Sequence, residues 1–358
     1  MLFRSIIAAG QADVVAVVRA TIADTEFLNK AKGVNPEPLK PCIGLNECIN
    51  RKQVEGLPYA CGVSTRWARE WELRDLPSRT SKPRNVLVVG AGPAGTELAC
   101  QLTEQGHTVR LWEKADRVGG LLNVAAKLRA NEKYAKWVQY QAERLERLGV
   151  EVTFGKDATA ADVMAAGADV VAIATGSTPR VPHIAGIDSP NVMMAAAVAR
   201  GTATPGHRVA VLCEDDGPAP LSVSDHLAGL GHEVTLIVQS NQIAPLVGKY
   251  SIGSMLARLV DGGVRFVHMA RVDRIDGDTL HLAATYGTRH WTEGPFDSVV
   301  VAAGSQGNDS LFRELKGQHP SVHLLGDAFA PRRVVFADRK STRLNSSHIP
   351  LSRMPSSA

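Results

Sequence analysis

The sequence predicts an α/β fold with two doubly wound domains. The first observation is a strand–helix–strand pattern that begins at Asn85, and the second is the same pattern starting again at Arg208. The third is a glycine-rich turn, residues 90–95, between the first strand and its helix. Strands that alternate with helices form parallel sheets covered by helices on both faces. A chain of 358 residues is long enough for two or three such domains.

Residues 1–40 precede this pattern and read as helix, strand and helix. The expected strand is the apolar run 13–19, and a polar helix follows over residues 24–32. A lone unit of this kind exposes apolar residues on both faces of its strand, so it cannot form a domain by itself. We therefore expect it to belong to a larger sheet or barrel. Residues 41–80 follow as a loop-rich, cysteine-containing segment and linker.

From Asn85 onward, apolar runs and turn signals predict a series of strands and helices. In the first unit these are strand 86–89, helix 94–105 and strands 108–112, 151–154 and 169–174. In the second they are strands 208–212 and 233–238, with a helix between them that ends near Gly231. The remaining predicted strands are 264–267, 272–275, 279–283, 298–302 and 322–325.

The turn Gly90-Ala91-Gly92-Pro93-Ala94-Gly95 follows a strand and opens a helix, which is the context of a dinucleotide-binding fingerprint. Gly90 allows the tight turn, Gly92 lets the backbone approach a pyrophosphate, and Gly95 lets the helix pack closely on the strand. Glu113, at the end of the next strand, is placed to bind the hydroxyls of an unphosphorylated ribose. The alternative is that the glycines serve only to make the turn.

Three further segments fit a flavin-binding version of this domain: Gly119-Gly120-Leu121, Ala174-Thr175-Gly176 and Gly326-Asp327. In their order and spacing they resemble the pyridine nucleotide-disulfide reductase type of flavoprotein, in which the second domain is inserted into the first. Asp327 would place a carboxylate beside the ribityl chain of a flavin. The predicted cofactor-binding residues are Gly90, Gly92, Pro93, Ala94, Gly95, Glu113, Lys114, Gly120, Leu121, Ala174, Thr175, Gly176, Gly326 and Asp327.

Three cysteines lie at iron–sulfur spacing ahead of this domain. Cys42, Cys48 and Cys61 fit a Cys-x2-Cys-x2-Cys-x12-Cys pattern in which Leu45 takes the place of the second cysteine. Three thiolates can hold a cluster with one open iron or a three-iron cluster, and the alternative is a loop without a cluster. The odd total of five cysteines argues against a disulfide framework.

The second domain has a poor version of the glycine turn. Its first strand is followed by Glu214, Asp215, Asp216 and Gly217, so one glycine stands with three carboxylates where phosphates would bind. A carboxylate close to a phosphate costs about 1 to 4 kcal/mol at surface-like dielectric. This cost is enough to cancel what a helix dipole contributes to phosphate binding. We predict a Rossmann-like shape that binds NAD(P) weakly or not at all, with a working nicotinamide site as the alternative.

Composition excludes several classes of protein. A net charge of +4 without a basic stripe argues against nucleic-acid binding, and no apolar run reaches the 18 or more residues of a membrane span. No secretory signal stands at the N-terminus, so we expect a cytoplasmic protein. The sequence singles out no catalytic residue.

Residues 6 to about 337 resemble a known family. The segment from Ala16 to Asp24, the cysteine loop from Pro41 to Arg51 and the acidic turn 214–217 are similar to iron–sulfur flavoproteins of the NADH:flavin oxidoreductase (old yellow enzyme-like) group. These are trimethylamine dehydrogenase, dimethylglycine and N-methylproline demethylases, and 2,4-dienoyl-CoA reductase. The resemblance implies an FMN-binding TIM barrel, of which this chain keeps the last βα unit, with Arg19 on the FMN phosphate.

The resemblance also implies a division of the chain. Residues 1–40 would be the barrel remnant, 41–80 the cluster loop and linker, 81–180 plus 295–340 the domain for FAD or ADP, and 181–294 the nested, degenerate NAD(P)-like domain. Residues 341–358 look like translated adaptor sequence, and residues 1–5 are expected to share that origin.

The function implied is that of an electron-transfer and nucleotide-binding part of a flavin-dependent, iron–sulfur oxidoreductase. Its parent would oxidise or demethylate a secondary or tertiary amine, hold a 4Fe-4S cluster, pass electrons to an electron-transfer flavoprotein and form a homo-oligomer. Two alternatives stay open: an NAD(P)H-dependent 2,4-dienoyl-CoA reductase-like enzyme, and a non-catalytic nucleotide-binding fragment.

Overall fold

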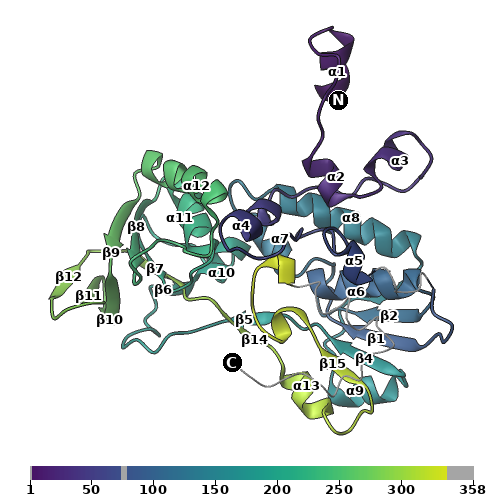
Figure 1. The fold of residues 1–358 in the computed structure, drawn as a ribbon. Helices are drawn as coiled ribbons and strands as arrows, with labels where there is room; N and C mark the ends of the chain where they lie inside the picture. The colour runs from purple at the N-terminus through teal and green to yellow at the C-terminus, as the bar shows by residue number, and fades with distance from the viewer. Residues whose placement is uncertain (1, 74–78, 337–358) are drawn as a thin grey trace.

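The computed structural model describes residues 2–73 and 79–336, so the segment 341–358 lies outside the described residues. Figure 1 shows two α/β domains side by side, each built on a parallel sheet, with an N-terminal arm projecting away from them. The expectation of two Rossmann-like domains, the second nested in the first, is confirmed by this topology.

The first sheet has five parallel strands in the order β15-β4-β1-β2-β3. Its central strands are continuous apolar runs because helices cover both faces. Helices α6 and α8 pack on one face, and α9 and α13 pack on the other. The elements are β1 (Asn85–Val89), α6 (Pro93–Glu104), β2 (Thr108–Trp112), α7 (Leu121–Ala125), α8 (Lys133–Arg147), β3 (Glu151–Thr153), α9 (Ala160–Ala165), β4 (Val170–Ile173), α13 (Ser310–Leu315) and β15 (Val322–Leu324).

The second sheet is also parallel, in the order β6-β13-β7-β8-β9. Helices α10, α11 and α12 cover one face, and a three-stranded antiparallel sheet, β10-β11-β12, packs on the other. The elements are β6 (Val192–Met194), α10 (Ala195–Arg200), β7 (Arg208–Cys213), α11 (Ala219–Gly229), β8 (Glu233–Val238), α12 (Lys249–Asp261), β9 (Arg265–His268), β10 (Ala270–Asp276), β11 (Thr279–Ala284), β12 (His290–Glu293) and β13 (Ser298–Ala302).

Two short strands connect the domains. The chain leaves the first domain through β5 (Ser177–Pro179) and returns through β14 (Ser305–Gly307), and these two strands pair antiparallel. The predicted return of the chain at residue 295 is wrong, because β13 pairs with β6 and β7 in the second sheet. Every residue of β13 is buried, as expected for a strand with a neighbour on each side.

The N-terminal arm contains α1 (Leu2–Ala8), α2 (Arg19–Ala23) and α3 (Phe27–Ala31). The predicted strand over residues 13–19 is wrong: this segment is irregular and runs into α2, with Val14 82% and Val18 63% exposed. A strand needs a neighbour for its backbone hydrogen bonds, and none of the described strands pairs with this segment.

The cysteine loop follows the arm and contains α4 (Glu47–Gln53), and α5 (Glu70–Leu73) comes next. Two 3-10 turns, η1 (Gly326–Ala328) and η2 (Val334–Phe336), end the described chain. None of the helices in the described ranges has both the length and the apolar character that crossing a bilayer requires.

Candidate functional site

The glycine turn at the carboxyl end of β1 has the geometry that its sequence predicts. Gly90 has a φ of +103°, and a Cβ there would collide with the carbonyl of Ala174, directly after the neighbouring strand β4. A Cβ at Gly95 would collide with the carbonyl of Gly90, so this glycine allows α6 to start directly against the turn. A Cβ at Gly92 would meet nothing within 4 Å, so the backbone there faces open space at the start of α6.

Glu113 follows β2 and braces this turn. It is buried, and its carboxylate accepts the backbone N–H of Ala91 at 2.6 Å and that of Ala115 at 2.9 Å. Two accepted hydrogen bonds leave lone pairs on both oxygens for further donors. The carboxylate therefore stands beside the turn as expected for a ribose-binding acid. The next residue, Lys114, is exposed.

The segment that leads into α7 lies against the same turn. Gly119 donates its backbone N–H to the carbonyl of Ala91 at 2.8 Å. Gly120 has a φ of +52°, and a Cβ there would lie 3.1 Å from the Cα of Gly92. Leu121 begins α7 and is 39% exposed. These predicted residues thus form one wall beside Gly92.

Two segments distant in sequence complete the surroundings. Thr175 donates its hydroxyl to the carbonyl of Asn308 at 2.6 Å, which ties the end of β4 to the returning chain. Gly326 has a φ of +60°, and a Cβ there would lie 2.7 Å from the Cβ of Ala94. Asp327 follows, where burial raises the pKa of its carboxyl and the backbone N–H of Arg332 lowers it less. The predicted residues from 90 to 327 therefore meet at one edge of the first sheet.

The three predicted cluster ligands lie close enough to influence one another. Burial raises the pKa of the Cys48 thiol, and the charge of Cys42 raises it further. Burial likewise raises the pKa of Cys61, with contributions from the charges of both other cysteines. Within the described ranges no three thiols, imidazoles or carboxylates lie at the spacing of ligands to a single metal ion. A cluster differs, because it distributes its thiolates over several irons.

Leu45 lies in the same volume as the cysteines. A Cβ at Gly62 would collide with the Cδ1 atom of Leu45, so the leucine side chain rests on the backbone directly after Cys61. Leu45 and Cys61 also pack on one apolar cluster with Ile43 and Trp137. Position 45 therefore supplies an apolar side chain beside the backbone that follows Cys61.

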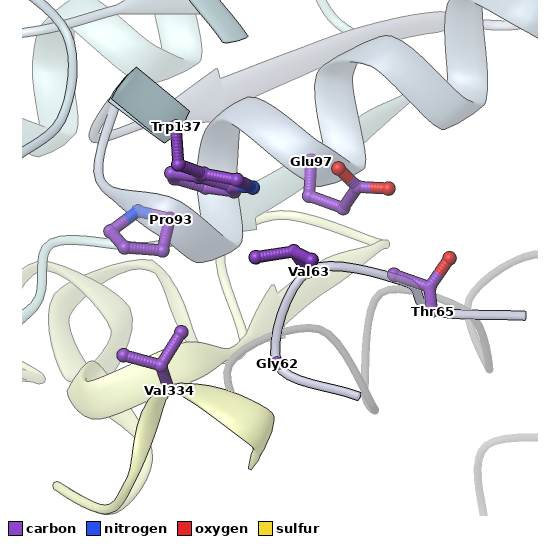
Figure 2. A pocket seen from close by; sticks show the side chains of 7 residues that line it. All are labelled: Gly62, Val63, Thr65, Pro93, Glu97, Trp137 and Val334. Carbon is purple, nitrogen blue, oxygen red and sulfur yellow. The ribbon is translucent and has the colours of Figure 1, made fainter. Parts of the chain in front are cut away.

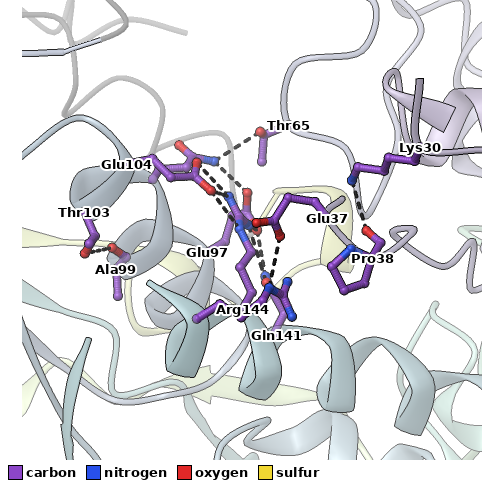
Figure 3. A network of polar contacts seen from close by, with 12 residues as sticks. Lys30, Glu37, Pro38, Thr65, Glu97, Ala99, Thr103, Glu104, Gln141 and Arg144 are labelled. Atoms are coloured by element: carbon purple, nitrogen blue, oxygen red, sulfur yellow. Dashed lines mark hydrogen bonds and ion pairs between the residues drawn. The ribbon is translucent and has the colours of Figure 1, made fainter. Parts of the chain in front are cut away.

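A buried polar network, shown in Figure 3, joins the cysteine loop to α6 and α8. Gln101 donates to Thr65, four residues after Cys61, at 3.1 Å, and to Glu97 at 2.8 Å. Arg144 donates to Glu97 at 2.9 Å and to Glu104 at 2.9 Å. The sequence analysis did not find this network, because its members are ordinary helix residues with no recognisable spacing.

Glu97 is the centre of this network. Burial alone would raise the pKa of its carboxyl, but the charges of Arg144 and Lys40 and hydrogen bonds from Gln101 and Gln141 hold the pKa at about 2. Lys40 precedes the cysteine loop and Thr65 follows it. The charge of Lys40 and the hydrogen bond to Thr65 therefore link both flanks of the loop to the helix that begins at the glycine turn.

A small cavity lies between the cysteine loop and the glycine turn (Figure 2). Val63 and Thr65 come from the segment after Cys61, and Pro93 comes from the first turn of α6. Trp137 of α8 is 3% exposed, and its indole N–H has no hydrogen-bond acceptor among the described residues. Residues from the cysteine loop and from the glycine turn thus line one cavity. The lining residues are Gly62, Val63, Thr65, Pro93, Glu97, Trp137 and Val334.

The corresponding turn of the second domain is closed by its own side chain. Asp215 accepts the backbone N–H of Gly217 at 2.8 Å, and Glu214 pairs with Arg180 at 3.0 Å. In a phosphate-binding turn such an N–H group would point at the ligand. Here the carboxylate of Asp215 already accepts the N–H of Gly217.

Arg19 lies apart from these sites. It is exposed at the start of α2 in the N-terminal arm, away from the first sheet (Figure 1). Its contact with an FMN phosphate stays a prediction, as do the roles of the cysteines and of the residues around the glycine turn.

Comparison with known proteins agrees with this arrangement. The model of the family "Pyridine nucleotide-disulphide oxidoreductase" matches residues 53–169 and 85–321. The metal reductase of Desulforamulus reducens is 29% identical over 94% of this chain and 54% of its own length. The dimethylamine dehydrogenase of Hyphomicrobium is 29% identical over 95% of this chain and 52% of its own length. The chain therefore spans about half the length of the curated relatives it matches.

A solved structure gives the same result. Histamine dehydrogenase from Rhizobium sp. 4-9 superposes with a TM-score of 0.89 at 25% identity, over 98% of this chain and 57% of that one. The resemblance to iron–sulfur flavoproteins that act on amines, predicted from the cysteine loop and the acidic turn, is confirmed by these relatives. The parallel sheet, the glycine turn at its edge and the family match lead to one conclusion: the chain belongs to the pyridine nucleotide-disulphide oxidoreductase family.

Proposed function

We propose that this chain is the electron-transfer and nucleotide-binding part of a flavin-dependent, iron–sulfur oxidoreductase whose complete form oxidises a secondary or tertiary amine. One observation carries the proposal. The cysteine loop and the glycine turn are joined through the hydrogen bond from Gln101 to Thr65 and through the shared cavity. Two redox groups held at these places would lie in adjoining parts of the chain, as electron transfer between them requires.

The residues at the edge of the first sheet fit a flavin nucleotide. The open face of Gly92 and the N-terminus of α6 suit a pyrophosphate, since backbone N–H groups and the helix dipole both favour an anion there. Glu113 would accept ribose hydroxyls, and Asp327 would face the ribityl chain. FAD bound there would accept a hydride and release electrons singly. ADP fits the same contacts up to the ribityl chain.

The cysteine loop fits a cluster held by three thiolates. Cys42, Cys48 and Cys61 would be the ligands, and Leu45 would shield the side of the cluster where the motif lacks a fourth thiolate. A cluster there transfers single electrons at a potential set by charge and solvent exposure. Cys48 and Cys61 are half-buried, so two of the three sulfurs are partly shielded from water.

The amine substrate is inferred from two observations. Relatives named dimethylamine dehydrogenase and histamine dehydrogenase match nearly the whole chain. The carboxylate of Asp215 in the second turn disfavours NAD(P)H as the electron source, so electrons would enter from a substrate and leave through the cluster. An electron-transfer flavoprotein would suit the role of acceptor. An NAD(P)H-fed reductase of unsaturated acyl compounds is the competing function.

A visible absorption spectrum with iron and acid-labile sulfide analysis tests the proposal. Flavin bands together with a broad cluster shoulder, and iron and sulfide in equal amounts, are the expected result. A colourless protein that binds only ADP would overturn it in favour of a non-catalytic nucleotide-binding fragment. Rapid flavin bleaching at micromolar NADH would favour the NAD(P)H-fed reductase.

A further inference from the structure

Lys133 is the first residue of α8, and its side chain lies over the cysteine loop. A Cβ at Gly44 would lie 2.8 Å from the Nζ atom of Lys133 and 3.4 Å from its Cε atom. Gly44 has a φ of +64°, a conformation that favours glycine, and it donates its backbone N–H to the Cys42 sulfur at 3.4 Å. A positive charge therefore lies on the same turn that holds the Cys42 thiol.

The start of α8 is fixed relative to this turn. Trp137, one helical turn after Lys133, is buried in an apolar cluster with Ile43, and Tyr134 packs on the same cluster. Ile43 lies between Cys42 and Gly44. Packing on both sides thus holds the backbone of Lys133 beside the cysteine loop, and only the side chain is free to move.

Lys133 forms no ion pair with a carboxylate of the described residues. Lys30 pairs with Asp24 at 2.9 Å and Lys156 pairs with Asp162, but the structure gives Lys133 no such partner within the ranges it describes. Cys42 is the exposed member of the three cysteines, so Lys133 and the most accessible thiol share one surface.

We propose that Lys133 raises the reduction potential of the cluster held by Cys42, Cys48 and Cys61, an inference that rests on the proposed function. Reduction adds one electron from the flavin to the cluster and makes its charge more negative by one unit. A nearby cation stabilises the reduced form more than the oxidised form, because the attraction grows with the negative charge. Leu45 is apolar, so it adds no charge that would offset the charge of Lys133.

The test is a redox titration of the cluster followed by electron paramagnetic resonance. In Lys133→Gln, the ratio of reduced to oxidised cluster at a fixed potential falls about three- to tenfold at low ionic strength, while Lys133→Arg keeps the wild-type ratio. Salt near 1 M shrinks the difference, because the side chain is exposed to screening. An unchanged ratio in Lys133→Gln, or a difference that molar salt leaves intact, would overturn the inference.

Lys316→Gln is the matched control. Lys316 is an exposed lysine that follows α13 on the opposite face of the first sheet, so the same charge is removed far from the cysteine loop. The ratio of reduced to oxidised cluster in Lys316→Gln should equal that of the wild type. Iron analysis separates the two proposals. A wild-type protein without iron refutes both the proposed function and this inference. A wild-type protein with a full cluster whose ratio of reduced to oxidised form is unchanged in Lys133→Gln refutes this inference alone.

Discussion

Asp215 accepts the backbone N–H of Gly217 at 2.8 Å, so the second nucleotide turn carries an internal carboxylate in place of a bound phosphate. The turn after the first strand therefore differs between the two domains: it is open at Gly92, and a carboxylate closes it at Gly217. Because of this difference, separate substitutions can test the two turns independently.

Substitution Asp215→Ala should strengthen NADH binding by about tenfold. It frees the N–H of Gly217 and removes one charge that repels the pyrophosphate, an effect of about 1 to 4 kcal/mol at surface-like dielectric. Fluorescence titration with NADH measures the change. Asp261→Ala, at the exposed end of α12, removes the same charge elsewhere and should leave the affinity unaltered. Equal affinities in Asp215→Ala and wild type would show that Asp215 does not block the turn.

Substitution Leu45→Cys should increase the iron and sulfide content per chain. Position 45 lies against the backbone after Cys61, so a thiol there joins the other three and completes the four-thiolate set. Metal and sulfide analysis of the purified variant measures the gain. Leu45→Ala, which removes the same bulk without adding a ligand, should show none. The expectation fails if Leu45→Cys and Leu45→Ala contain equal iron.

Substitution Gly92→Ala should weaken flavin binding without loss of stability. Gly92 has a φ of −72° and open space at its Cβ position, so alanine fits the unliganded backbone. The methyl group would occupy the approach of the pyrophosphate, and the loss of one or two charge-assisted hydrogen bonds weakens binding about tenfold to hundredfold. Flavin titration with a parallel melting curve tests this. Gly253→Ala in α12, where the Cβ also meets nothing, should keep full flavin affinity.

Substitution Arg144→Met should destabilise the protein by about 3 to 5 kcal/mol, because it leaves the buried carboxylate of Glu97 without its main cation. Arg147→Met, on the same helix, breaks an exposed pair with Glu37 and should cost under about 1 kcal/mol. Urea unfolding of both variants measures the free energies. Similar losses in the two variants would mean that the network around Glu97 adds no stability.

The same network predicts a dependence of stability on pH. The pKa of Glu97 is about 2 in the folded protein, below its usual value of 4.5, so the folded state favours the charged carboxylate. Its stabilising contribution, on the order of 3 kcal/mol, is complete above about pH 4.5 and is lost as the pH falls toward 2. Glu97→Gln should show a flatter decline of unfolding free energy between pH 4.5 and pH 3. A decline as steep as that of the wild type would assign the acid sensitivity to other groups.

The sequence was sufficient wherever local pattern and tertiary packing agree. Buried parallel strands such as β8 (Glu233–Val238) have the predicted bounds, and the glycine turn has the expected geometry, because both are determined by neighbours in sequence. The sequence was insufficient where the pairing of strands decides whether a segment is a strand and to which sheet it belongs. The apolar run 13–19 reads as a strand but has no strand beside it, and β13 lies in the second sheet because β6 and β7 receive it there.

The candidate site shows the same division. Glu113 was predicted from its distance to the glycine turn, whereas its hydrogen bond to Ala91 requires the two strands to be side by side. Glu97, Arg144 and Lys133 carry no sequence signal, because their roles arise only when α6 and α8 pack against the cysteine loop.

The antiparallel pair formed by β5 and β14 has a consequence for the architecture. Pro179 and Ser305 stand opposite each other where the chain leaves the first domain and comes back. The second domain is thus attached through two adjacent strands, whereas β1 and β4, which pair beside the glycine turn, both belong to the first sheet. The acidic turn after β7 therefore lies in a domain that adds no strand to the sheet carrying the glycine turn. Substitutions in the inserted domain therefore change no strand of the sheet that carries the glycine turn.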